Sequence, residues 1–142
     1  MTNLKDMNML PENQWIDVCH LDDITPNTGV GALIAGQSVA LFRVGNEKRI
    51  YALSNKDPFS QANVMARGII GDLQGERVIA SPIYKQHFSL ATGRCLEDKD
   101  QKLSVFPTKI ENGRVWVGTV PQKTYITNNG VSQEKLKLVL IG

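Results

Sequence analysis

His87 and Cys95 are the side chains in the middle of this sequence whose types could together do chemistry. An imidazole that deprotonates a nearby thiol makes a nucleophile, but such a pair also needs a third group to orient the base and donors for the oxyanion. The sequence gives no signal for either. A single imidazole is also more often structural or exposed than a metal ligand. We therefore expect no catalytic residue and no metal site on this chain.

The cysteines do not indicate oxidised chemistry either. Cys19 and Cys95 are far apart, and neither has a C-x-x-C partner, so no disulfide framework is indicated. Each is expected to be a small buried apolar residue.

Two proline-containing segments pose the main functional question. Residues 52–59 read Ala-Leu-Ser-Asn-Lys-Asp-Pro-Phe, and residues 81–84 read Ser-Pro-Ile-Tyr, followed at 87–93 by His-Phe-Ser-Leu-Ala-Thr-Gly. Together they resemble the two cluster loops of the Rieske family, which offer one Cys and one His each, as C-P-H and C-P-x-H. In that family two thiolates hold one iron of a 2Fe–2S cluster and two imidazoles hold the other.

The positions that correspond to these ligands carry other residues. When the loops are aligned on their prolines, the positions are occupied by Asp57, Phe59, Ser81 and Tyr84. A phenyl ring has no lone pair to donate, and a serine hydroxyl or tyrosine phenol is a poor substitute for thiolate or imidazole at low-valent iron. We therefore expect no 2Fe–2S cluster, and no other cofactor, on this chain.

The resemblance extends from about residue 15 to residue 118. It is closest to one branch of the family, the small subunits of NADH-dependent assimilatory nitrite reductases. The segments that carry it, besides the two loops, are residues 21–33, 39–42, 68–72 and 112–117. In that branch some members keep the ligands and others lack them.

The resemblance implies a supporting role. The large subunit of such a reductase carries FAD, an iron–sulfur cluster and sirohaem, and it passes electrons from NADH to nitrite to make ammonium. Together with the missing ligands, the resemblance therefore implies a non-redox small subunit that is not catalytic alone and whose partner is that large subunit. We expect it in the cytoplasm, because residues 1–14 contain no apolar stretch long enough for a signal peptide. The alternatives are a Rieske-type ferredoxin, which would need the four ligands, and a stand-alone module that binds a small molecule.

The loop tip has two explanations. Phe59 and Tyr84 could fill the space of the cluster, because an empty apolar cavity costs roughly 24 cal/mol per Å³, and the tip could also dock on the large subunit. We favour packing as the immediate cause. Lys56, Arg67 and Lys85 place positive charge on or beside the loops. They either steer an acidic partner or form an ordinary solvated rim.

The elements that must position these loops are indicated by alternating apolar residues and turn signals. We expect an all-β fold, a Rieske-like antiparallel β sandwich with an inserted loop and hairpin subdomain at about residues 52–97. Trp15 and Trp116 are expected in the core. Hairpin turns are expected at 45–47 and at Asn112-Gly113. The expected strands are 15–19, 38–44, 49–54, 77–80, 87–90, 103–110 and 114–119, with a helical turn at 62–67.

Composition limits the class of protein. The 142 residues, 42% hydrophobic and 21% charged, suit one folded domain at 15–120, with an extension at 1–14 and a tail at 121–142. The run at 135–141 could be an added edge strand or a flexible extension. A net charge of +2 does not indicate nucleic acid, and no stretch suits a signal peptide or a membrane span.

Overall fold

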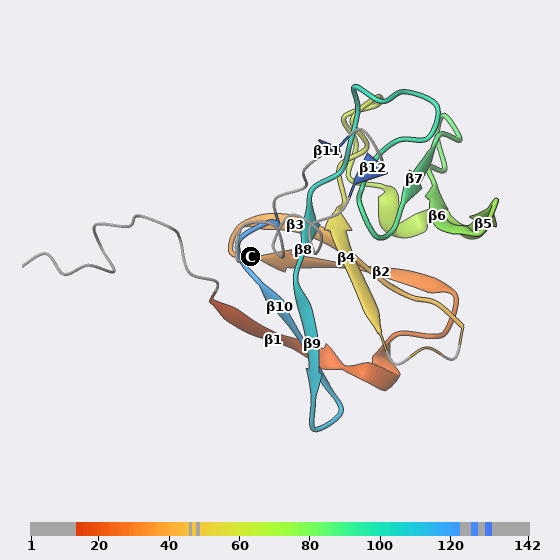
Figure 1. Ribbon diagram of the computed structural model, residues 1–142. Helices are drawn as coiled ribbons and strands as arrows, with labels where there is room; N and C mark the ends of the chain where they lie inside the picture. The colour runs from red at the N-terminus through yellow and green to blue at the C-terminus, as the bar shows by residue number, and fades with distance from the viewer. Residues whose placement is uncertain (1–13, 46, 48, 123–125, 128–129, 132–142) are drawn as a thin grey trace, which may run out of the picture.

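The structure, a computed structural model, consists mainly of short antiparallel strands joined by turns (Figure 1). It describes residues 14–45, 47, 49–122, 126–127 and 130–131. Within this part of the chain, helix is limited to two 3₁₀ turns, as expected for an all-β fold, and no helix is long and apolar enough to cross a membrane. The elements are β1 (Trp15–His20), η1 (Leu21–Asp23), β2 (Thr28–Ile34), β3 (Gln37–Arg43), β4 (Ile50–Ser54), η2 (Met65–Arg67), β5 (Ile69–Leu73), β6 (Glu76–Ala80), β7 (His87–Ser89), β8 (Val105–Phe106), β9 (Thr108–Glu111), β10 (Arg114–Gly118), β11 (Ile126–Thr127) and β12 (Gly130–Val131).

A four-stranded sheet with the order β2-β3-β4-β8 lies in the middle of the molecule. Strand β3 is apolar on both faces: Val39 and Leu41 belong to one core cluster, and Ala40 and Phe42 to another. All four side chains are fully buried. Strand β4 follows the same alternation and pairs with β3, with Phe42 opposite Tyr51, which confirms the expected hairpin. The middle sheet therefore serves two cores at once.

A second sheet, with the order β1-β10-β9, packs on one face of the middle sheet. Val115 and Val117 of β10 are fully buried in the same cluster as Leu41 of β3. The β9–β10 turn is made by Asn112 and Gly113, whose φ angles are 53° and 75°. Positive φ at both positions is the conformation that an Asn-Gly hairpin turn requires, and it confirms this hairpin.

The outward face of the second sheet carries the two tryptophans. Trp116 is half-buried and Trp15 is 37% exposed, and neither belongs to a core cluster, so the expectation that both lie in the core is wrong. The ammonium of Lys109 lies 4.6 Å from the ring centroid of Trp15 and 5.7 Å from that of Trp116. Because Val115 and Val117 point inward, alternation along β10 turns Trp116 toward this cation, which the negative ring faces attract.

The third sheet, with the order β5-β6-β7, packs with η2 on the other face of the middle sheet. Met65 of η2, Ile79 of β6 and Phe88 of β7 are fully buried in one cluster with Ala40 and Phe42 of β3. This arrangement positions two loops side by side. Loop 1, residues 55–64, runs from β4 to η2, and loop 2, residues 81–86, joins β6 to β7.

Some elements differ from the sequence prediction. The strand expected at 103–110 is divided at Pro107 into β8 and β9, because a proline cannot donate to the ladder. Strands β2 and β5 were not expected, since glycines interrupt their alternating pattern. The run at 135–141 lies outside the described residues.

Candidate functional site

Loop 1 is held at its base by Asn55. The buried side chain donates from Nδ2 to Oγ of Ser38 at 3.1 Å and accepts at Oδ1 from the backbone N–H of Ala66 at 2.8 Å. The Asn55 carbonyl accepts from the N–H of Met65 at 3.0 Å. Asn55 thus joins the start of the loop to β3 and its end to η2. Sequence reasoning missed this role because its side-chain partners are 17 and 11 residues away.

Asp57 and Ser81, which the alignment on the prolines assigns to the thiolate positions, contact each other. Oγ of Ser81 donates a 2.5 Å hydrogen bond to Oδ2 of Asp57, and the N–H of Phe59 donates to Oδ1 at 2.8 Å. Asp57 is 0% exposed and Ser81 is 1% exposed. A donor for each carboxyl oxygen offsets the cost of burying this group. The two loops are therefore joined by a buried side-chain hydrogen bond across 24 residues of sequence.

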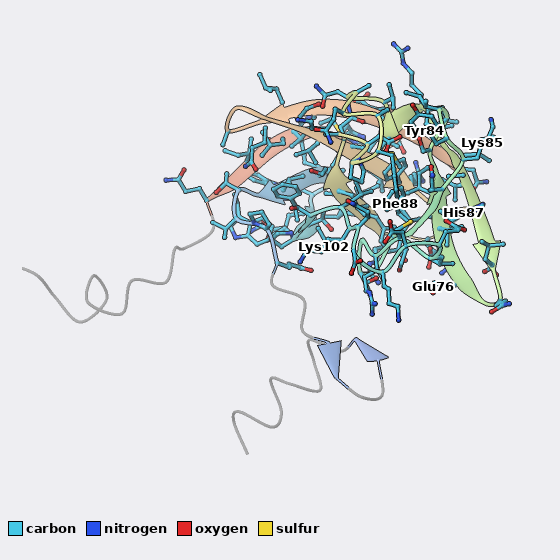
Figure 2. The ribbon with its side chains drawn as sticks, turned by 90° about the horizontal axis from the view of Figure 1, so that it is seen from above. Glu76, Tyr84, Lys85, His87, Phe88 and Lys102 are labelled. Carbon is cyan, nitrogen blue, oxygen red and sulfur yellow. The ribbon has the colours of Figure 1, made fainter. Side chains whose placement is uncertain are left out.

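Phe59 and Tyr84, which the same alignment assigns to the imidazole positions, lie in different environments. Phe59 is half-buried, and its ring centroid is 6.2 Å from that of Phe88 in the core, as the packing interpretation requires. Tyr84 is 57% exposed, so the expectation that it fills a cluster site is wrong. The physical reason is a tight turn: the N–H of Lys85 donates to the carbonyl of Ser81 at 3.1 Å, and Lys85 has a φ of 67°. This turn directs its tip to solvent, where Tyr84 and Lys85 lie side by side (Figure 2).

These four side chains do not fit the 2Fe–2S cluster that the resemblance implies. Asp57 and Ser81 are already paired with each other, and the ring of Phe59 has no donor atom. A Rieske cluster requires two thiolates and two imidazoles, and none of these groups is present at the four positions. Across the residues that the structure describes, no group of three or more His, Cys, Asp and Glu side chains is arranged to hold a metal ion.

Lys56, Arg67 and Lys85, the expected docking rim, are all exposed. Loop 1, η2 and loop 2 contain one carboxyl group, that of Asp57, and it is buried and bonded to Ser81. The formal charge that these segments present to solvent is therefore positive.

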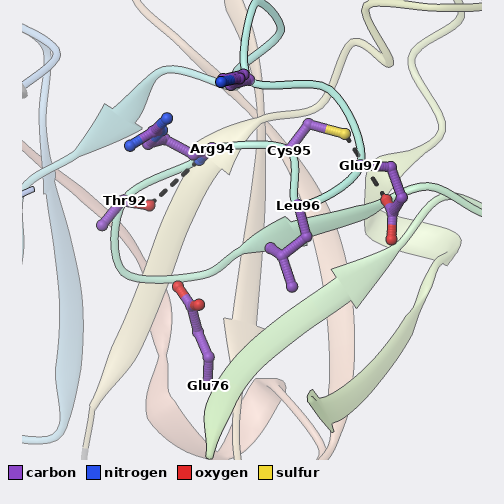
Figure 3. Close-up of a pocket in the computed structure, with 7 residues that line it drawn as sticks. Glu76, Thr92, Arg94, Cys95, Leu96 and Glu97 are labelled. Carbon is purple, nitrogen blue, oxygen red and sulfur yellow. Dashed lines mark hydrogen bonds between the residues drawn. The ribbon is translucent and has the colours of Figure 1, made fainter. Parts of the chain in front are cut away.

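Cys95 lies at a separate feature, an open cavity of about 520 Å³ beside β6 and the turn that follows β7 (Figure 3). The cavity is lined by Glu76, Thr92, Arg94, Cys95, Leu96, Glu97 and Lys99. None of the four loop positions lines it. Its lining contains two carboxyl groups and two cationic groups, so it does not present charge of one sign to a ligand.

Glu97 stands between Cys95 and His87. The thiol of Cys95 donates to Oε1 of Glu97 at 3.8 Å, and Nδ1 of His87 lies 2.8 Å from Oε2. Burial raises the pKa of the Cys95 thiol. Burial would also raise the pKa of the Glu97 carboxyl, but hydrogen bonds from the N–H and imidazole of His87 outweigh it and lower that pKa. The thiol therefore faces a carboxylate, which is a weak base, while the imidazole of His87 bonds to Glu97 and not to the thiol; this is not the geometry of an activated nucleophile. Sequence reasoning did not single out Glu97, because no local pattern marks a residue ten positions from its partner.

Comparison with known proteins finds relatives over most of the chain. A family described as Rieske-like [2Fe-2S] domain matches residues 14–118. The nitrite reductase (NADH) small subunit of Salmonella typhimurium is 43% identical over 103 residues, which make up 72% of this chain and 95% of that protein. The solution structure of a nitrite reductase [NAD(P)H] small subunit from Erwinia carotovora matches with a TM-score of 0.67 at 44% identity, over 80% of this chain and 88% of that chain.

A larger protein also contains a similar segment. The nitrite reductase [NAD(P)H] large subunit of Klebsiella oxytoca is 44% identical over 109 residues, which cover 77% of this chain. The chain spans only 11% of the length of that protein.

Proposed function

The chain belongs to the Rieske-like [2Fe-2S] domain family and is a homologue of nitrite reductase small subunits, and from this premise we propose that it is a non-redox small subunit of an NAD(P)H-dependent nitrite reductase. Its antiparallel β fold is the Rieske-like fold that the sequence predicted. In this proposal a large subunit reduces nitrite to ammonium, and this chain binds and orients the large subunit without carrying electrons. We place the complex in the cytoplasm, where NAD(P)H is available.

The observation that carries the non-redox role is the pairing of Asp57 with Ser81. Both side chains are buried, and their hydrogen bond joins the two positions that the alignment on the prolines assigns to the thiolates of one iron. With Phe59 and Tyr84 at the imidazole positions, the loops offer no ligand that an iron–sulfur cluster prefers. A ferredoxin role has no donor set to support it.

The Klebsiella oxytoca protein supports the partnership. A segment similar to this chain is part of a single polypeptide named a large subunit. There a segment of this kind is covalently part of a large-subunit polypeptide. Binding of this chain to a separate large subunit would bring the same two parts together without a covalent link.

Iron analysis and reconstitution test the non-redox part. The chain, purified anaerobically and incubated with iron and sulfide, is expected to show no stoichiometric iron and no Rieske absorption bands. A Rieske ferredoxin that has all four ligands, treated in parallel, is the positive control. Stoichiometric iron with Rieske absorption in this chain would overturn the non-redox role.

Co-purification tests the partner part. The tagged chain is expected to retain the large subunit of the same organism, and the pair is expected to consume nitrite with NADH faster than the large subunit alone. This chain alone is expected to consume none. If the tagged chain fails to retain the large subunit, the partnership is wrong.

A further inference from the structure

Three neighbouring segments, residues 56–60, 67–69 and 82–85, form a region that we call the tip, in which Lys56, Arg67, Ile69, Ile83, Tyr84 and Lys85 are exposed. The hydrogen bond between Asp57 and Ser81 joins loop 1 to loop 2. Ile69 is paired with Ala80, the residue before loop 2, so the segment that contains Arg67 lies directly beside it. The tip is therefore assembled from three segments that the fold holds together.

The tip combines exposed apolar side chains with charge of one sign. Ile69, Ile83 and Tyr84 are large hydrophobic residues that the structure leaves exposed. Lys56 and Arg67, like Lys85 next to Tyr84, are exposed and form no ion pair with another residue in the described part of the chain. An apolar centre with a charged rim is the usual composition of a protein-docking surface.

The tip is also held in one shape before any partner binds. The Asp57 N–H donates to the carbonyl of Ala62 at 2.9 Å, and the Ser81 N–H donates to the carbonyl of Gln86 at 2.9 Å. The N–H of Ile83 donates to Oγ of Ser81 at 3.3 Å. A surface that is already ordered loses less conformational entropy on binding, which favours affinity.

From these contacts we propose that the tip docks on an acidic patch with an apolar centre on the large subunit. The inference rests on the proposed function and adds to it the surface used and the chemistry of the partner. The occupant is acidic because the exposed formal charges of the tip, Lys56, Arg67 and Lys85, are all positive. A second copy of this chain is a poor occupant, since a two-fold contact between identical tips would place like charges opposite each other.

Charge reversal on the tip tests the proposal. In the triple variant Lys56→Glu, Arg67→Glu and Lys85→Glu, the Kd for the purified large subunit is expected to rise at least about tenfold, because attraction becomes repulsion. The matched control reverses three exposed cations that lie outside the tip segments, Arg49, Lys99 and Lys102. Its Kd is expected to change less than about twofold, because these cations do not belong to the proposed docking surface.

Truncation of the apolar centre is the second arm. Tyr84→Ser is expected to weaken binding, whereas Leu73→Ser, at the exposed end of β5 that lies away from Ile69, is expected to leave it unchanged. Circular dichroism of all variants checks that they fold. Wild-type affinity in both tip variants would overturn the proposal. Concentration-dependent self-association that the triple variant abolishes would assign the tip to a second copy instead.

The two levels of inference fail differently. If the wild-type chain does not bind the large subunit, the proposed function fails. If the wild-type chain binds and the tip variants bind equally well, only the docking surface is wrong.

Discussion

Asp57 and Ser81 show, at the scale of single residues, how two loops stay together without a metal. A pair of thiolates would reach a shared iron, whereas these side chains reach each other directly at 2.5 Å. The positions themselves could be predicted from the alignment of Pro58 and Pro82. Their contact could not, because it depends on how loops 24 residues apart fold. The exposure of Tyr84 was equally hidden, since it follows from the φ of the next residue.

Removing the carboxyl group measures what this contact contributes. Asp57→Ala leaves the Ser81 hydroxyl and the Phe59 N–H without their partner in a buried place. The free energy of unfolding is expected to fall by about 1–3 kcal/mol, the cost of unsatisfied buried polar groups. Denaturant titration of the two single variants and of the double variant with Ser81→Ala should give a coupling energy of roughly 0.5–3 kcal/mol.

Asp72→Ala is the matched control for that cycle. The Asp72 carboxyl also accepts a backbone N–H, from Gly75 at 2.9 Å, but it is exposed. Its loss is expected to cost less than about 0.5 kcal/mol, and its effect should add to that of Ser81→Ala. Additive effects for Asp57 and Ser81 as well would mean that their hydrogen bond does not join the loops energetically.

Turn chemistry made the hairpins predictable at the scale of elements. The Asn112-Gly113 turn needs only two adjacent residues with positive φ, and the sequence displays them. Strand β2 was missed because Gly29 and Gly31 supply no side chain to the alternating pattern. The third sheet gave weak signals because its strands are short and β5 is largely exposed. Hairpins between clearly alternating runs were therefore predicted, whereas the equally local β2–β3 and β5–β6 hairpins were missed because one strand of each lacks a clear alternating pattern.

Gly93 is an element-scale feature that can be tested. It has a φ of +80°, and an added Cβ would lie 2.0 Å from the carbonyl oxygen of Leu103. Gly93→Ala is expected to lower the free energy of unfolding by at least about 3 kcal/mol, of which the left-handed backbone explains roughly 1–2 kcal/mol. Denaturant titration measures the loss.

Gly75→Ala separates the two causes. Gly75 has a φ of +84°, but an added Cβ there has nothing within 4 Å. The free energy of unfolding of this variant is expected to fall by only about 1–2 kcal/mol, the part due to the left-handed backbone conformation. Equal losses at Gly75 and Gly93 would show that the close approach to Leu103 contributes nothing.

The whole molecule consists of a packed β scaffold and a tip whose exposed charged side chains are all positive. The overall charge of +2 indicated nothing about partners. The sequence places Lys56, Arg67 and Lys85 on or beside the loops, and the structure adds that folding buries Asp57 and leaves these three cations exposed on joined loops. Charge that looks evenly distributed along a sequence can be concentrated in space, and composition alone does not show it.

The middle sheet, shared by two cores, has a consequence for how the protein opens. Strands β3 and β4 contribute side chains to both cores. Neither core can therefore unfold alone without exposing one face of these two strands. In native-state hydrogen exchange, the free energy of opening of the Met65 and Ser81 amides, at the two loops, should therefore fall with denaturant as steeply as that of the Leu41 amide. The amide of Gly75, in an exposed turn, should exchange through small local openings. If the opening free energy of the loop amides alone fell less steeply with denaturant, the loops would be unfolding independently of the sheet. If all three open together, the loops persist as long as the sheet does, and every encounter with a partner finds them already in place.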